Sequence, residues 1–106
     1  MGTEMTLEAL LRAKRDEILQ ICAKYGARNV RVFGSVARGE ADEQSDIDLL
    51  VEFEPNRSLL DHAGLWVELQ ELLGVKVDVV SAHGLKPRIR ERVLQEAIPL
   101  CRSRRS

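Results

Sequence analysis

The sequence predicts an α/β (or α+β) fold in which helices pack against one small mixed sheet of three to four strands. Apolar residues recur at spacings of three and four in residues 6–25, 58–73 and 87–97, as in amphipathic helices. Short segments rich in β-branched residues, 29–33 and 46–53 among them, alternate with these helices along the chain. This alternation of helices and strands is typical of a domain built as helix layers on a sheet.

Composition limits the classes to which the chain can belong. With 106 residues, 44% of them hydrophobic, and a net charge of -1, the chain is typical of a globular protein and not of a disordered segment. We therefore expect one domain over residues 1–106, ordered over about 7–101, with a disordered tail at 102–106. No apolar run approaches the ~18–20 residues of a membrane span. The N-terminal residues lack a signal-peptide pattern, so we expect a cytoplasmic protein with no membrane contact.

The first half of the chain predicts a helix, a strand and a short helical turn. Residues 6–25 form one helix, which Gly26 ends. Residues 29–33 follow as a strand, closed by Gly34 and Ser35, and the next four residues form the helical turn. The apolar stripe of the helix consists of Leu7, Leu10, Leu11, Ile18, Ile21, Cys22 and Tyr25.

A second strand, residues 46–53, has two different faces because side chains alternate along a strand. Residues 58–73 then form a helix that opens with a capping box of Ser58 and Asp61 and ends at Gly74. Trp66 belongs to its apolar stripe, so we expect it in the core. One face of the strand carries Ile47, Leu49, Val51 and Phe53, and the other carries Asp46, Asp48, Leu50 and Glu52.

The last third of the chain predicts one more strand and one more helix. Residues 75–80 form the strand, which places Asp78 on the face opposite Val77 and Val79. Pro87 suits the first turn of the helix, and Pro99 ends it. Leu100 and Cys101 are expected to add a short strand, and the helix is expected to be anchored by Ile89, Val93, Leu94 and Ala97.

The two cysteines and two histidines do not form a metal-binding set, because none has a second Cys or His at ligand spacing. Cys22 lies on an apolar stripe and is expected to be a buried structural thiol, as is Cys101. His62 and His83 are isolated in the sequence, and we expect neither to be catalytic.

Two short motifs carry residues suited to phosphate chemistry. At Gly34-Ser35, the glycine allows backbone to approach a phosphate and the serine adds a hydroxyl donor. Asp46 and Asp48 share a strand face, about 6.6–6.8 Å apart along the strand, and they repel each other unless a cation lies between them. If this strand pairs with the next one, Asp78 joins them, as two-metal nucleotidyl transfer requires. An ordinary turn and solvent-facing aspartates are the alternatives.

Together these residues resemble the signature of the minimal nucleotidyltransferases, a family of the DNA polymerase beta-like nucleotidyltransferase superfamily. The signature is Gly-Ser, ten further residues and Asp-Ile-Asp, and the segment VFGSVARGEADEQSDIDLLVEF resembles the family over its whole length. The segment VKVDVV is similar to the strand that carries the third carboxylate of the family. The resemblance spans residues from about 7 to 101 and implies the polymerase beta-like nucleotidyltransferase fold.

The resemblance implies a nucleotidyltransferase that uses Mg²⁺ and ATP. Asp46 and Asp48 would hold two Mg²⁺ ions, and Asp78 would ligate one of them near the attacking hydroxyl and help to remove its proton. Gly34 and Ser35 would hold the triphosphate of the nucleotide. For Arg38 two roles stay open: it reaches a phosphate, or it pairs with Glu40 and Asp42.

The resemblance also implies a partner. Larger members of the superfamily add a helical domain that helps to grip base or acceptor, and free-standing minimal members are similar to the antitoxin half of a two-protein system. The other half is a helical HEPN-domain toxin, and the minimal enzyme transfers AMP from ATP to a tyrosine of that toxin. We take this reaction as the leading expectation, with a partner encoded nearby.

Three alternatives stay open at this point. The protein neutralises its partner by complexation alone, or it transfers the nucleotide to a small molecule, or it binds nucleic acid through the basic residues 86–106. The third is disfavoured by the 4% aromatic content and by a pI near 6.1. The acidic residues 40–56 could also pair with the basic segment of a second chain, which would give a homodimer.

Overall fold

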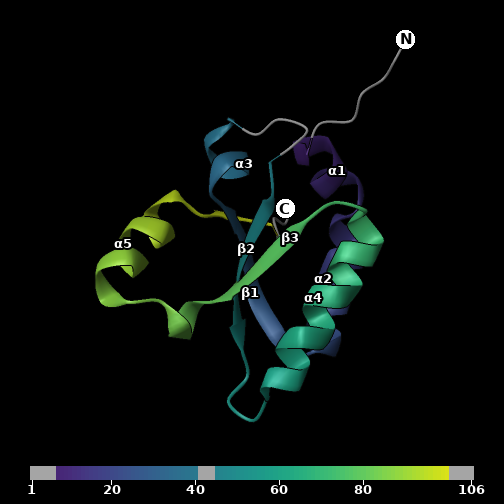
Figure 1. The fold of residues 1–106 in the computed structure, drawn as a ribbon, viewed down its shortest axis with the longest axis vertical. Coiled ribbons are helices and arrows are strands. Elements are labelled where there is room, and N and C mark those ends of the chain that lie inside the picture. Colours follow the sequence, from purple (N-terminus) through teal and green to yellow (C-terminus); the bar gives the residue numbers. More distant parts are fainter. Residues whose placement is uncertain (1–6, 41–44, 101–106) are drawn as a thin grey trace, which may run out of the picture.

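A four-stranded mixed sheet forms the centre of the fold (Figure 1). The structure is a computed structural model that describes residues 7–40 and 45–100. The strands lie in the order β3-β2-β1-β4, with β2 antiparallel to β1 and parallel to β3, and β4 antiparallel to β1. The predicted α/β class with a small mixed sheet is confirmed. The strands are β1 (Ala27–Phe33), β2 (Ile47–Phe53), β3 (Val77–Ser81) and β4 (Ile98–Pro99).

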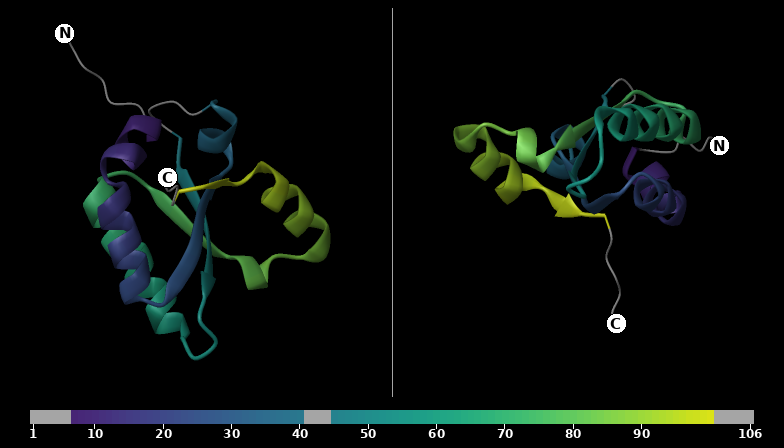
Figure 2. Two further views of the ribbon diagram at one scale, coloured as in Figure 1. Left: turned by 180° about the vertical axis from the view of Figure 1, so that it is seen from behind. Right: turned by 90° about the horizontal axis from the view of Figure 1, so that it is seen from below.

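Helices lie on both faces of the sheet, but unequally (Figure 2). Three of them pack on one face, and α5 lies on the other, to the side of the sheet. None of the helices in the described part of the chain is long and apolar enough to cross a membrane. The helices are α1 (Leu7–Ala13), α2 (Arg15–Lys24) and α4 (Leu59–Leu73) on the first face, α5 (Pro87–Glu96) on the second, the short α3 (Ser35–Arg38), and a 3₁₀ turn at Ala82–Gly84.

The alternation of β2 divides the interior into two clusters, as the sequence predicts. Ile47, Leu49 and Val51 are buried in the main core, against α1, α2 and α4. Leu50 points the other way and is also fully buried, in a small second cluster with Val93 of α5. The side chains of β2 therefore point to the faces predicted for them. Asp48 lies on the same side of β2 as Leu50.

Helix α5 is anchored by fewer residues than the sequence predicts. Of the four expected anchors of α5, only Val93 is buried, whereas Ile89 is 48% exposed and Leu94 is 37% exposed. The reason is the position of α5, which stands beside the sheet instead of across it (Figures 1 and 2). One turn of the helix consequently supplies most of its apolar contact.

Two element boundaries differ from the prediction. The expected single helix over residues 6–25 is divided at Lys14 into α1 and α2, although the hydrogen bonds from Lys14 N–H to Leu10 and from Ile18 N–H to Lys14 continue through the break. No Pro or Gly marks this position in the sequence. Strand β1 begins two residues early, because Ala27 and Arg28 also pair with β2, across a register shift at which Asn29 adopts a φ of 52°.

Side chains of α4 cover the outer edge of β3. Trp66 Nε1–H donates to the Val77 carbonyl at 2.7 Å, and Gln70 Oε1 accepts from the Val77 N–H at 3.2 Å. His62 Nε2 lies 2.8 Å from the Val79 carbonyl. An edge strand exposes unpaired backbone groups. These contacts provide partners for the backbone groups of Val77 and Val79 on this edge. Trp66 was expected in the core, but it is 41% exposed, since its indole N–H reaches this edge.

Three further expectations concern the thiols and the C-terminus. Cys22 is buried as expected, and burial raises the pKa of its thiol to about 12. The predicted strand at Leu100 and Cys101 lies earlier, at β4, and Leu100 N–H donates to the Val30 carbonyl at 2.9 Å. Cys101 and the predicted tail at 102–106 lie outside the described residues.

Candidate active site

The three predicted carboxylates come together where β2 and β3 begin. Asp48 and Asp78 are paired positions of the parallel β2–β3 ladder. Paired residues of parallel strands project to the same face of a sheet, so the two carboxylates are neighbours. Asp46 precedes β2 by one residue. Asp48 is half-buried and Asp78 is exposed on the edge strand, so the group is open to solvent on the side of β3.

Like charges dominate the electrostatics of this group. The pKa of Asp48 is raised above its ordinary value, first by burial and then by the negative charges of Asp78 and Asp46, and only the charge of Arg38 acts in the opposite direction among the main causes. Within the described ranges, no Lys or Arg forms an ion pair with any of the three aspartates. In the described part of the chain, the carboxylates thus face one another without an ion pair to a basic side chain.

Gly34 lies next to the Asp48 carboxylate. It follows β1, has a φ of 78°, and precedes α3. A Cβ atom added to Gly34 would lie 2.3 Å from Asp48 Oδ2. A side chain here would therefore collide with the carboxylate, and the backbone conformation is one that non-glycine residues rarely adopt. The role of Gly34 and Ser35 in holding a phosphate stays a prediction, and Ser35 is the half-buried first residue of α3.

A fourth carboxylate, which sequence reasoning missed, meets the same turn. The Gly34 N–H donates to Glu96 Oε2 at 2.8 Å, although 62 positions separate the two residues. Arg38 Nη1 lies 3.2 Å from Glu96 Oε1, and Arg38 Nε donates to Glu40 Oε1 at 3.1 Å. These bonds raise the pKa of the Arg38 guanidinium, Glu40 first and Glu96 second. The pairing with Glu40 is one of the two predicted roles of Arg38, and Asp42 lies outside the described residues.

The three aspartates fit a divalent cation, provided that water or phosphate oxygens supply its remaining ligands. Among residues 7–40 and 45–100, no three Asp, Glu, His or Cys side chains form an arrangement that could hold a metal ion by themselves. Carboxylate oxygens without a countercharge are nevertheless the hard ligands that Mg²⁺ prefers, and Mg²⁺ usually takes one or two of them and completes its shell with water and phosphate oxygens. The prediction of two Mg²⁺ ions stays a prediction.

Asp78 also borders a hollow of about 400 Å³ beside the edge of the sheet. Most of its lining comes from α4, and it is mainly apolar. It is lined by Leu59, His62, Ala63, Trp66, Asp78 and Val79.

Comparisons with known proteins identify the family. Residues 15–100 match the family described as Nucleotidyltransferase domain. The chain is 42% identical over 98 residues to the protein adenylyltransferase MntA of Thermococcus cleftensis, an alignment that covers 92% of this chain and 96% of the relative. It is 63% identical to a solved structure described as a candidate minimal nucleotidyltransferase, with a TM-score of 0.82, over 92% of this chain and 99% of that one.

A more distant solved structure shares the fold. It is described as a tri-AMPylated HEPN toxin of Shewanella oneidensis in complex with its MNT antitoxin. The matched chain is 17% identical, with a TM-score of 0.66, over 87% of this chain and 72% of that one. At this identity the likeness concerns the fold alone.

Fold, carboxylate geometry and family match define an enzyme of the nucleotidyltransferase class. The chain belongs to the minimal nucleotidyltransferase family within that class, and its relatives include proteins named protein adenylyltransferases.

Proposed function

We propose that this protein transfers AMP from ATP to a hydroxyl group of a partner protein, in a Mg²⁺-dependent reaction. The acceptor is a tyrosine of a HEPN-domain toxin, and the protein acts as its antitoxin in the cytoplasm. The pairing of Asp48 with Asp78 beside Gly34 carries the proposal. It places two acidic groups next to a turn whose backbone lies close to the Asp48 carboxylate. The names of the adenylyltransferase relative and of the toxin–antitoxin complex support a HEPN toxin as the acceptor protein, whereas the tyrosine rests on the family resemblance alone.

In this reaction the acceptor oxygen bonds to the α-phosphorus of ATP, and the bond from that phosphorus to the pyrophosphate oxygen breaks. Bound Mg²⁺ would supply positive charge to the attacking and leaving oxygens. Asp46 and Asp48 would hold the metal together with the phosphates. Gly34 and Ser35 would bind the triphosphate.

Asp78 would receive the proton of the acceptor hydroxyl. Its carboxylate is exposed and borders the hollow beside α4, so an acceptor can reach it from outside the sheet. Docking of a partner protein would hold the hydroxyl in the correct orientation, which converts a collision into an effectively intramolecular step. We therefore expect very slow turnover of ATP by the isolated protein.

The test is to purify the protein with the helical protein encoded beside its gene and to add ATP and Mg²⁺. We expect the mass of the partner to increase by one or more AMP units, on a tyrosine. The increase should disappear in Asp48→Asn and Asp78→Asn and persist in Asp16→Asn, which removes an exposed carboxylate of α2.

Two outcomes would replace the proposal. If the partner binds tightly but its mass never changes, the protein neutralises it by complexation alone. If a small molecule such as an aminoglycoside is modified without any partner, the reaction class is right and the acceptor is wrong.

A further inference from the structure

One side chain, Glu96, contacts two donors at and beside the Gly34-Ser35 turn. Glu96 Oε2 accepts from the Gly34 N–H at 2.8 Å, and Glu96 Oε1 lies 3.2 Å from Arg38 Nη1. A carboxylate oxygen and a phosphate oxygen can occupy the same position here, since both are anionic and accept hydrogen bonds from N–H groups. A nucleotide phosphate that bound to Gly34 and Arg38 would have to take the place of Glu96.

We propose that Glu96 occupies the phosphate position of the nucleotide-free protein, and that ATP binds by displacing it from Gly34 and Arg38. Glu96 is then a residue that sets nucleotide affinity, by competition and not by contact with ATP. This inference rests on the proposed function only in naming the triphosphate of ATP as the ligand.

The attachment of Glu96 to the fold is suited to such a displacement. It is the last residue of α5, which is anchored by Val93, while Ile89 and Leu94 are 48% and 37% exposed. The side chain of Glu96 is itself 23% exposed, so solvent can receive it. The strand that follows, β4, has only two residues. Moving Glu96 away from the turn therefore disturbs little buried surface.

The opposite role would give an opposite result. If Glu96 served to hold Gly34 and Arg38 in position for the nucleotide, its removal would loosen both donors and weaken phosphate binding. Competition predicts that the same removal frees both donors and strengthens binding. The sign of the change in affinity therefore decides between the two roles.

The experiment measures binding of inorganic tripolyphosphate by calorimetry in metal-free buffer, and the KM for ATP in the AMP-transfer reaction. We expect Glu96→Ala and Glu96→Gln to bind tripolyphosphate more tightly, on the order of tenfold for the alanine variant, since a hydrogen bond to a charged group no longer competes. The KM for ATP should fall in proportion while kcat does not rise.

Two further variants serve as controls. Glu91→Gln removes an exposed carboxylate from the same helix and should leave tripolyphosphate affinity unchanged, which separates competition from a general change of charge. Glu40→Gln frees only the Nε side of Arg38 and should give a smaller increase than Glu96→Ala. Thermal unfolding of each variant shows that the comparison is made between folded proteins.

The outcomes separate this inference from the proposed function. Unchanged or weaker tripolyphosphate binding in both Glu96 variants would overturn the inference, and AMP transfer by the wild type would still support the proposed function. Tighter binding in the variants of a protein that transfers no AMP would support the competition and contradict the proposed function.

Discussion

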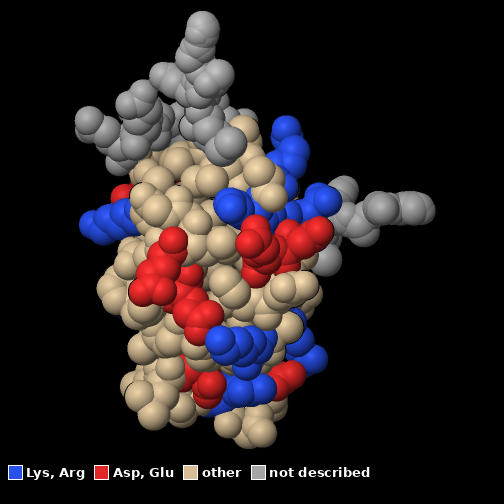
Figure 3. Space-filling model, turned by 90° about the vertical axis from the view of Figure 1, so that its right-hand side faces the viewer, with Lys and Arg blue, Asp and Glu red and all other residues tan. Residues whose placement is uncertain are grey.

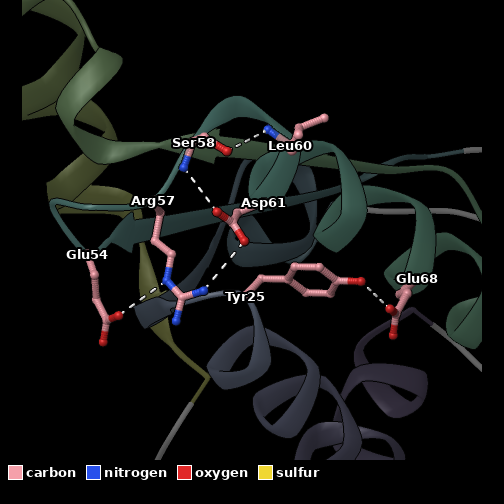
Figure 4. A network of polar contacts seen from close by, with 7 residues as sticks. All are labelled: Tyr25, Glu54, Arg57, Ser58, Leu60, Asp61 and Glu68. Atoms are coloured by element: carbon pink, nitrogen blue, oxygen red, sulfur yellow. Dashed lines mark hydrogen bonds and ion pairs between the residues drawn. The ribbon is translucent and has the colours of Figure 1, made fainter.

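The two ends of β2 use carboxylates in opposite ways. At the end where β2 begins, Asp46, Asp48 and Asp78 face one another without a cationic partner in the described part of the chain. At the end where β2 finishes, acidic side chains accept hydrogen bonds from neighbouring N–H and O–H groups (Figure 4). The first end holds the candidate active site, and the second holds the connection into α4. The candidate active site and the stabilising polar network thus lie at opposite ends of β2.

The network at the second end satisfies its groups locally. Arg57 lies between two carboxylates, 3.3 Å from Glu54 Oε1 and 3.5 Å from Asp61 Oδ1. Asp61 Oδ2 also accepts from the Ser58 N–H at 3.0 Å, and Ser58 Oγ accepts from Leu60 N–H at 3.2 Å. The predicted capping box of Ser58 and Asp61 is therefore confirmed. Each acidic group here is close to a donor.

Tyr25 and Glu68 extend this pairing to α2. The Tyr25 hydroxyl donates to Glu68 Oε2, and Lys24 Nζ lies 2.9 Å from the same oxygen. The ring of Tyr25 passes over Gly64, where an added Cβ would lie 2.6 Å from the ring. On the face that carries α4, Lys and Arg side chains lie close to Asp and Glu side chains (Figure 3). In this region, unlike at the three aspartates of the candidate site, acidic side chains have donors or basic side chains close by.

The largest expected effect comes from Asp48→Asn. It should reduce AMP transfer on the order of a hundredfold or more, as loss of a preorganised electrostatic contact does, and yet raise the melting temperature at pH 7 in metal-free buffer. The raised pKa means that folded Asp48 holds its proton more tightly than unfolded Asp48, so its charged form lowers the free energy of unfolding. The gain should therefore shrink as the pH falls toward the ordinary Asp value of 3.8.

Thermal unfolding of wild type and Asp48→Asn across this pH range measures the effect, with Asp16→Asn as the control. A variant that is less stable than the wild type at pH 7 would show that Asp48 is paired in solution, and the contrast between the two ends would disappear.

Gly34→Ala should have the next largest effect, this time on stability. Its added Cβ would collide with Asp48 Oδ2 in a backbone conformation that favours glycine. Gly39→Ala is a matched control, because Gly39 has a similar φ of 74° but no atom within 4 Å of an added Cβ. Denaturant unfolding should show losses of about 3 kcal/mol for Gly34→Ala and about 1 kcal/mol for Gly39→Ala. Equal losses would mean that the contact with Asp48 is unimportant.

Ser58→Ala should act on the other end alone. It removes the side-chain acceptor of the capping box, which costs about 1 kcal/mol of stability. AMP transfer should be unaffected at temperatures where the protein is folded, because Ser58 lies at the far end of β2. An activity loss larger than the loss of folded protein would show that the two ends are coupled.

The smallest effect is expected from Tyr25→Phe and appears as a change in pH dependence. Hydrogen bonds from Tyr25 and then Lys24 lower the pKa of Glu68 below its ordinary value of 4.5. This contribution to stability is present above that value and is lost as the pH falls through the lowered pKa. Tyr25→Phe should flatten the acid side of the stability profile slightly, measured by thermal unfolding between pH 2 and pH 6, because solvent and salt screen an interaction at this exposed site. An unchanged profile would contradict the role of the Tyr25 contact.

Much of the fold could be predicted because its signals are local. The two faces of β2, the Ser58–Asp61 capping box and the glycine that ends α4 each follow from residues a few positions apart. The Gly-Ser and Asp-Ile-Asp spacing likewise identified the turn and two of the carboxylates, and through resemblance the family. Such features need only the period of a strand or a helix and the conformational freedom of glycine.

Other features depended on which distant segments meet. The sequence by itself determined that Asp46, Asp48 and Asp78 would share a side if their strands paired, but only the parallel register of β2 and β3 brought Asp48 beside Asp78. The contact of Glu96 with Gly34 and the exposure of Trp66 at the sheet edge had no signal in spacing or composition. The physical reason is that such contacts arise from the packing of α4 and α5 against the completed sheet, which joins residues that no local period relates.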